Sequence, residues 1–230
     1  PQGFCTLAGV GGREYGLKAD RMLFAKEHLG WTIDQWKQVI WTDESSFESG
    51  KSGQLRVWRT ADEEFNQECT GSTHKSGRTS VMVWGAIAYD QKSELVVMDK
   101  NKRTAADFVD QVYDGPLLQF LTGFIDPILM EDGAPIHRAK AATEWRDELE
   151  LKKLIWPAQS PDMNPIENLW AVMKKAVQKV HKSGDTVDVL IKNIKEAWEN
   201  IPMEVINRLV ETMPTRVNEL KKNKGKSTRY

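Results

Sequence analysis

The sequence predicts a mixed α/β domain in which helices pack over one sheet. Short runs of β-branched and aromatic residues alternate with amphipathic stretches of helical period. Their order along the chain is three strands, a helix, a strand, a helix, a strand and then further helices. With 230 residues, of which 40% are hydrophobic, the chain is long enough to bury a core. We therefore expect one compact domain.

The first elements lead to an acidic residue on a strand. Residues 1–17 are Gly-rich and are expected to form a linker, whereas residues 18–29 place apolar side chains roughly on one helical face. The run 36–47, with its core VIWTDESSF, has the β-branched and aromatic composition of a strand. It carries Asp43 near its end.

A long insertion follows this strand. Residues 48–79 are rich in Gly, Ser, Thr and charged residues, with one short strand expected at 55–59. So long an irregular stretch is usually functional. Two further strands, 80–89 and 94–98, are separated by the turn-like DQKS, which predicts a hairpin.

The middle of the chain leads to a second acidic residue. Thr104 is expected to cap a helix that runs to Leu121 and bends at Gly115-Pro116. The segment PILMEDGAP, from Pro127, indicates a short buried strand that ends at Asp132.

A third acidic residue lies in the first turn of a later helix. Asn164 is a good N-cap and Pro165 fits the first helical position, so this helix should run to about His181 with Glu167 near its start. The remaining expected elements are a helix at 136–149, a strand at 151–155, helices at 186–200 and 203–212, and a basic tail at 213–230.

The bulk composition limits the classes of protein. The formal charge of −1 means that any contact with nucleic acid must come from local basic patches. The two cysteines, Cys5 and Cys69, are too few for a disulfide framework or a zinc site. No apolar stretch reaches the length of a membrane span, and the start lacks the pattern of a secretory signal. We expect a soluble, intracellular protein.

Each of the three acids can also be explained by a purely structural role. Asp43 could simply end a strand, and Asp132 could initiate the turn Asp-Gly-Ala-Pro. Glu167 is spaced from Asn164 like the second member of a capping box. These readings remain open for each residue taken alone.

Taken together, the three carboxylates point to a metal site. Mg²⁺ prefers oxygen ligands, and phosphodiester chemistry commonly uses two such ions about 3.5–4 Å apart. The four histidines show no metal-binding spacing, and the sequence has no nucleophile elbow or glycine-rich phosphate loop that would indicate another chemistry. A nucleotide-hydrolysing motor is therefore not expected.

Three sequence blocks resemble the mariner superfamily of DDE transposases, in particular the branch typified by Sleeping Beauty. The blocks are WTDESSF at 41–47, DGAPIH at 132–137 and SPDMNPIENLW at 160–170. The 34 residues between Asp132 and Glu167 match the spacing of that branch. The runs VMVWGAI at 81–87 and MPTR at 213–216 are also similar to the family, and the resemblance covers roughly residues 18–230.

The resemblance implies a ribonuclease H-like mixed sheet flanked by helices, with the three acids at one edge of the sheet. It implies a metal-dependent endonuclease and strand transferase that cleaves transposon ends and joins them to TA sites in target DNA. Asp43, Asp132 and Glu167 would hold two Mg²⁺ ions, for which Mn²⁺ can substitute. The expected domains are a linker and leading helix at 1–30, the catalytic domain at 31–212 and the tail. A nuclear location follows.

By the same resemblance, residues 48–79 correspond to a clamp loop that reaches across to the partner subunit of a DNA-bound homodimer. Five of its cations could contact phosphates, although the loop also carries acids and could simply be solvated. Four residues near the acids are further candidates for DNA contact, with core, capping or solvated roles as alternatives. The nine candidates are Lys51, Arg56, Arg59, Lys75, Arg78, His137, Asn168, Lys174 and Lys175. Trp170 is expected in the core.

The sequence departs from the family at two positions. Gly133 stands where the family usually has Asn, and Glu131 where Gln is common. The paired helix-turn-helix domains that precede this core in the family are not visible, and we expect the chain to lack them. One alternative function is a domesticated core that binds DNA or dimerises without cleavage. Another is a ribonuclease H-type enzyme that cuts RNA in hybrids, because fold alone does not separate these activities.

Overall fold

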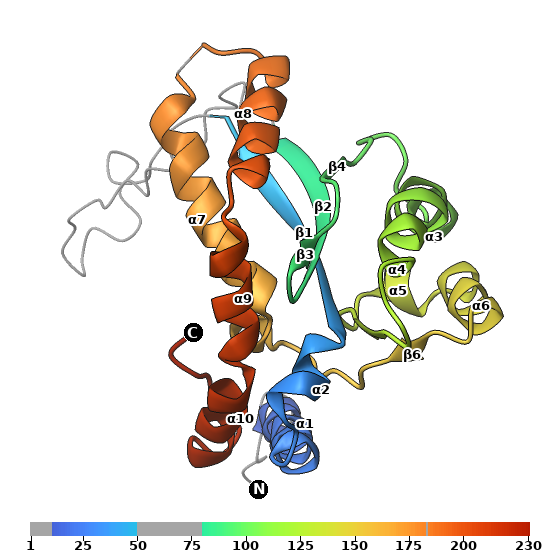
Figure 1. The fold of residues 1–230 in the computed structure, drawn as a ribbon, viewed down its shortest axis with the longest axis vertical. Coiled ribbons are helices and arrows are strands. Elements are labelled where there is room, and N and C mark those ends of the chain that lie inside the picture. Colours follow the sequence, from blue (N-terminus) through green and yellow to red (C-terminus); the bar gives the residue numbers. More distant parts are fainter. Residues whose placement is uncertain (1–10, 50–79, 183) are drawn as a thin grey trace, which may run out of the picture.

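The computed structural model describes residues 11–49, 80–182 and 184–230. Its centre is a mixed sheet in the order β3-β2-β1-β5-β6, with β4 also paired to β2 (Figure 1). Strand β1 is antiparallel to β2 and parallel to β5, which in turn is parallel to β6. The strands are β1 (Val39–Glu48), β2 (Ser80–Ala88), β3 (Gln91–Lys92), β4 (Val96–Val97), β5 (Ile128–Met130) and β6 (Lys152–Lys153).

Helices cover both faces of this sheet, as Figure 1 shows. One face packs against α1 (Gly11–His28), α2 (Ile33–Lys37), α7 (Pro165–Val180), α8 (Val187–Glu199), α9 (Met203–Glu211) and α10 (Met213–Lys222). The other carries α3 (Ala105–Phe108), the π-helix Val109–Leu117, α4 (Leu118–Leu121), α5 (Pro135–Arg138) and α6 (Lys140–Glu148).

The two faces follow from the period of two along the strands. On β1, Val39 and Trp41 belong to the core beneath α7, whereas Ile40 between them belongs to the core beneath α3. Successive side chains of a strand point to opposite faces, so both faces of a central strand must be apolar when helices cover both. The sheet thus separates two buried cores.

Several predicted elements are confirmed with adjusted ends. Thr104 caps α3 in a capping box with Asp107, and Pro116, which lacks an N–H donor, lies inside the π-helix Val109–Leu117. The predicted helix 136–149 is divided at Ala139, whose backbone is extended. The hairpin partner of β2 begins earlier than expected, at Gln91.

Three expectations about secondary structure were wrong. Trp36 lies in α2 rather than in the first strand, because Thr32 and Gln35 form a capping box that starts a short helix. Residues 11–17 are helical rather than linker. The predicted tail from residue 213 begins with α10, which buries an apolar face in the core beneath α7. Residues 50–79, which include most of the predicted insertion and the strand expected at 55–59, fall outside the described residues.

In the ranges that the structure describes, no helix has the length and apolar character to cross a membrane.

Candidate active site

Asp43 lies on the central strand, on the face that packs against α7. In the register of the sheet it pairs with Gly85 of β2. A Cβ atom on Gly85 would lie 3.0 Å from the rings of both Trp170 and Trp198, which stack on each other with centroids 5.4 Å apart. The missing side chain lets Trp170 lie close to the sheet, and its Nε1–H donates to Asp43 Oδ2 at 3.1 Å.

The surroundings of Asp43 oppose its ionisation. Burial, followed by the negative charges of Glu167, Glu44 and Asp132, raises the pKa of the Asp43 carboxyl to about 8. The protonated carboxyl is then able to share a proton with Glu167 through a side-chain hydrogen bond. A cation bound among these groups would favour the ionised form of Asp43 instead.

Glu167 faces Asp43 from the first turn of α7. Asn164 caps this helix by accepting from Ile166 N at 3.4 Å, and its amide donates to Thr42 O at 3.3 Å, so the helix start is tied to the strand beside Asp43. The capping-box reading of Glu167 is wrong, because no such box forms at this helix. Burial raises the pKa of Glu167, although the charge of Lys174 and the hydrogen bond with Asp43 oppose the shift.

Asp132 follows β5, the strand parallel to β1. Its Oδ1 accepts from Ala134 N at 2.8 Å, so it does initiate the predicted turn. The same side chain is 55% exposed, and its charge contributes to the raised pKa of Asp43. Thr42 Oγ1 donates to Met130 O at 2.9 Å and fastens the ends of the two strands together. The turn role and a role in a site are therefore compatible.

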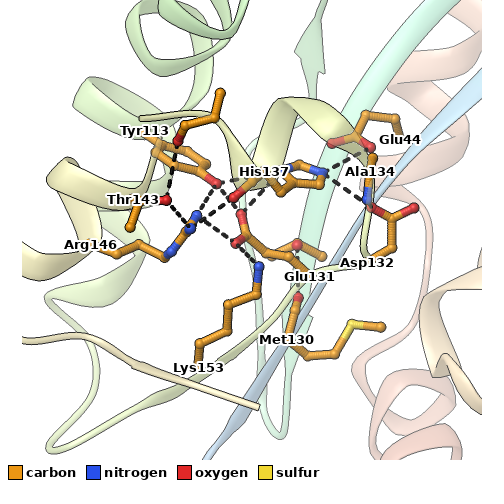
Figure 2. A network of polar contacts seen from close by, with 12 residues as sticks. Glu44, Tyr113, Met130, Glu131, Asp132, Ala134, His137, Thr143, Arg146 and Lys153 are labelled. Carbon is orange, nitrogen blue, oxygen red and sulfur yellow. Dashed lines mark hydrogen bonds and ion pairs between the residues drawn. The ribbon is translucent and has the colours of Figure 1, made fainter. Parts of the chain in front are cut away.

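A buried polar network lies behind Asp132 (Figure 2). Its centre is Glu131, whose side chain is 1% exposed and whose Oε2 lies 3.0 Å from Arg146 Nη1 and 3.1 Å from Lys153 Nζ. Tyr113 donates its hydroxyl proton to Glu131 Oε1. The pKa of Tyr113 is raised, first by burial and then by the charge of Glu131. We call Glu131, Arg146, Lys153 and Tyr113 the paired cluster, because cations balance its carboxylate.

His137 connects the paired cluster to the acids. Its Nδ1 lies 3.4 Å from Glu131 Oε1, and its Nε2 lies 3.6 Å from both Glu44 Oε2 and Asp132 Oδ1 (Figure 2). Burial alone would lower the pKa of His137, but the carboxylates of Glu44, Glu131 and Asp132 raise it. The ring therefore bridges Asp132 to a balanced buried group.

The other predicted contact residues are distributed as follows. Asn168 Oδ1 accepts from Arg216 Nη2 at 2.6 Å, so its amide oxygen is engaged within the protein. Lys174 Nζ lies 5.8 Å from the centre of the Phe47 ring, and Lys175 is exposed. Trp170 is 1% exposed, as expected for the core, although the sequence did not reveal its hydrogen bond to Asp43. The five loop cations lie outside the described residues.

The donor set fits a hard divalent cation. Across residues 11–49, 80–182 and 184–230, no three His, Cys, Asp or Glu side chains form a ready-made metal cage. Mg²⁺ does not require one, since it usually binds through one or two carboxylates and completes its shell with water and substrate phosphates. Burial, followed by the charges of neighbouring carboxylates, raises the pKa of Asp43, and a bound cation would favour its ionised form. Asp43, Asp132 and Glu167 are thus suitable ligands.

Comparisons with known proteins identify the family of this chain. The family described as DDE superfamily endonuclease matches residues 38–191. The Tc1 transposase of Caenorhabditis elegans is 31% identical over 215 residues, which are 91% of this chain and 77% of that protein. The Tc3 transposase of the same organism is 33% identical over 219 residues, covering 93% of this chain and 63% of that protein.

Solved structures show the same fold. A Mos1 transposase catalytic domain with raltegravir and Mn superposes with a TM-score of 0.72 at 16% identity, covering all of both chains. A Mos1 paired-end complex with the left transposon end also gives 0.72, at 17% identity over 99% of this chain and 67% of that chain. The predicted ribonuclease H-like architecture is confirmed.

Proposed function

Because this chain belongs to the DDE superfamily of endonucleases, as the catalytic core of a Tc1/mariner cut-and-paste transposase, we propose that Asp43, Asp132 and Glu167 hold its catalytic metal ions. The observation that carries this proposal is the convergence of the three carboxylates: Glu167 hydrogen-bonds to Asp43, and Asp132 lies near enough for its charge to act on Asp43. Burial, followed by the neighbouring carboxylates, raises the pKa of Asp43 to about 8, which agrees with this arrangement. Perturbed carboxyls of this kind cluster at functional sites. Acids arranged without sufficient counter-charge suit an external cation.

Mg²⁺ is the proposed ion, with Mn²⁺ in its place, and two ions when bound would activate the attacking water or 3′-hydroxyl and neutralise charge on the departing oxygen. The protein's own contribution is to hold the carboxylates. Trp170 fixes one oxygen of Asp43, and Asn164 ties the start of the Glu167 helix to the strand of Asp43. The turn at Ala134 orients Asp132. Solved Mos1 complexes with Mg and with Mn support the choice of metals.

We extend the proposal to the partners of the site. The substrates are transposon inverted-repeat ends and TA target DNA, and solved Mos1 complexes with transposon ends support a DNA substrate. Residues 48–79 form a clamp loop in a DNA-bound homodimer, within a catalytic domain at 31–212. The site of action is the nucleus. The non-catalytic, domesticated alternative is not favoured, since all three acids are retained.

A strand-transfer assay tests this function. A pre-cleaved duplex with a free 3′-hydroxyl and a supercoiled plasmid are incubated with Mn²⁺ and the protein, with DNA-reading domains of a relative fused if the chain alone does not bind. Joined products at TA sites that disappear in Asp132→Asn are expected. Glu144→Gln, which changes an exposed acid on α6, is the matched control and should leave joining unchanged. Binding of DNA without any joining would contradict the proposal.

A further inference from the structure

Two family-like motifs have no part in the proposed reaction. Ser160-Pro161-Asp162 precedes the helix of Glu167, and Met213-Pro214-Thr215-Arg216 begins α10. The structure brings them together, because Arg216 Nη1 donates to Asp162 O at 2.8 Å. We define the clasp as the hydrogen-bonded group formed by Arg21, Asp162, Asn168, Arg216 and Thr228.

The Asp162 carboxylate joins segments from opposite ends of the chain. Arg21 of α1 binds it in a bidentate manner, at 2.9 Å to Oδ1 and 2.7 Å to Oδ2, with side chains only 6% and 12% exposed. The backbone N–H of Thr228 donates to the same Oδ2 at 2.7 Å. Burial alone would raise the pKa of Asp162, but the hydrogen bonds from Arg21 and Thr228 and the charge of Arg21 lower it. The carboxylate is therefore held ionised.

Arg216 is fully buried, and each of its three side-chain nitrogens has a partner. Besides Asp162 O, Nη2 donates to Asn168 Oδ1 at 2.6 Å and Nε to Thr212 Oγ1 at 2.8 Å. The Tyr230 ring lies 4.4 Å from the guanidinium carbon. A planar guanidinium fixed in this way imposes its geometry on the groups that it contacts.

The clasp brackets Glu167. Of the three groups to which Arg216 donates, Asp162 O lies before Glu167 in the chain and Asn168 lies directly after it. The turn at Asp162 leads without a break into Asn164, the cap of α7. The N-terminus of α7 is therefore held from the C-terminal side of the domain by α10 and from the N-terminal side by α1, which lie together in Figure 1.

We propose that Asp162 and Arg216 are positioning residues, which fix the first turn of α7 so that Glu167 is presented to Asp43. This inference rests on the proposed function of the three acids, and it assigns a role to two motifs that the chemistry leaves unused. It also makes α1 and the C-terminal segment parts of the apparatus that sets the active-site geometry, although neither supplies an acid. A displacement of about 1 Å at a reacting group can lower a rate about a hundredfold.

A measurement of Trp170 separates positioning from activity. Its indole N–H, one turn beyond Glu167, donates to Asp43 Oδ2 and so reports the separation of α7 and β1. In the 230-residue chain labelled with ¹⁵N-tryptophan, Asp162→Asn should shift or broaden the Trp170 indole resonance, which Trp170→Phe identifies. The control Asn218→Ala removes an exposed side chain of α10, whose amide donates to Pro214 O, and should leave the resonance in place.

A second readout is the single-turnover rate of joining with pre-bound ends. Asp162→Asn should lower this rate about 10- to 100-fold while the dissociation constant for DNA changes less than about twofold. Asn207→Ala controls for stability, because it removes a tie from α9 to Asp90, away from the start of α7. Unchanged rate and resonance in a folded Asp162→Asn protein would overturn the inference.

If Asp162→Asn does not fold, Asn168→Ala decides the matter. This variant removes one acceptor of Arg216 at a half-buried position and retains the ion pair of Arg21 with Asp162. A shifted Trp170 resonance is expected, and an unshifted one overturns the inference. If the wild-type chain joins no DNA, the proposed function fails, but the resonance still tests the clasp.

Discussion

Two carboxylates at neighbouring strands, the buried Glu131 and the half-buried Asp43, have opposite surroundings. Glu131, just after β5, is matched by Arg146 and Lys153 and accepts from Tyr113. Asp43, on β1, faces Glu167 and other acids, and its pKa is raised to about 8. Both acids are withdrawn from solvent, but only Glu131 has cationic partners that balance its charge.

The difference shows what marks a functional acid in this protein. A buried charge is tolerated when partners compensate its desolvation, so the paired cluster needs nothing from outside the chain. At the candidate active site, Lys174 opposes the raised pKa of Glu167 only in part. Burial and the neighbouring acids together raise the pKa of Asp43, whereas Arg146 and Lys153 pair with Glu131. The shortage of paired positive charge beside Asp43 therefore indicates where a cation should bind.

The largest expected effect comes from removing the unbalanced charge. Asp43→Asn should lower DNA joining about a thousandfold or more, as for other catalytic groups that act as a unit. The same variant should be more stable than the wild type at pH 8 without metal, by roughly 1–3 kcal/mol. Joining assays and thermal unfolding across pH test both effects.

The sign of this stability change follows from the raised pKa. The carboxyl of Asp43 keeps its proton in the folded state up to about pH 8, whereas the unfolded chain loses it near pH 3.8. Wild-type stability should therefore fall as the pH rises from about 4 to 8. The advantage of Asp43→Asn should shrink toward pH 4, and an advantage that is independent of pH would contradict this explanation.

Removing a cation from the paired cluster should mainly lower the free energy of unfolding. Arg146→Met leaves Glu131 buried with only part of its counter-charge, which should cost about 3–5 kcal/mol in the free energy of unfolding. Urea titration measures the change. On the same helix, Lys140→Met removes an exposed pair with Glu144 and should change stability by less than about 1 kcal/mol. Equal effects of the two variants would remove the distinction between the clusters.

A smaller effect is expected at the start of α7. Asn164→Ala removes a helix cap and the bond to Thr42 O, at a cost of about 1–2 kcal/mol, and should also slow joining. Thr186→Ala removes the matching cap of α8 and should cost about as much without slowing joining. Equal joining rates in the two variants would show that the Asn164 cap does not help to position the active site.

The sequence predicted the local features of the fold well. The strands predicted from β-branched and aromatic residues, the caps Thr104 and Asn164 and the order of elements all follow from short-range physics. Trp36 was misassigned because its aromatic side chain suits a strand, whereas the capping box that begins at Thr32 starts a helix. Such local competition is decided by a few hydrogen bonds.

The partners of the site residues were harder to predict, because they are distant in sequence. Arg146 and Lys153 neutralise Glu131, and Arg216 meets Asp162, only once the sheet and helices have assembled. One usable signal was present at Trp170, since a buried indole N–H usually finds an acceptor. In this protein the acceptor is Asp43.

Calorimetric titration of Mn²⁺ into the metal-free protein tests the central claim most directly. At pH 7, in two buffers of different ionisation enthalpy, binding should release about one proton, because Asp43 must ionise to become a ligand. The affinity for Mn²⁺ should fall as the pH is lowered from about 8. At any one pH, Glu167→Gln should bind Mn²⁺ more weakly than the wild type. Equal Mn²⁺ affinity in the wild type, Asp43→Asn and Glu167→Gln, without proton release, would show that these acids do not form the metal site.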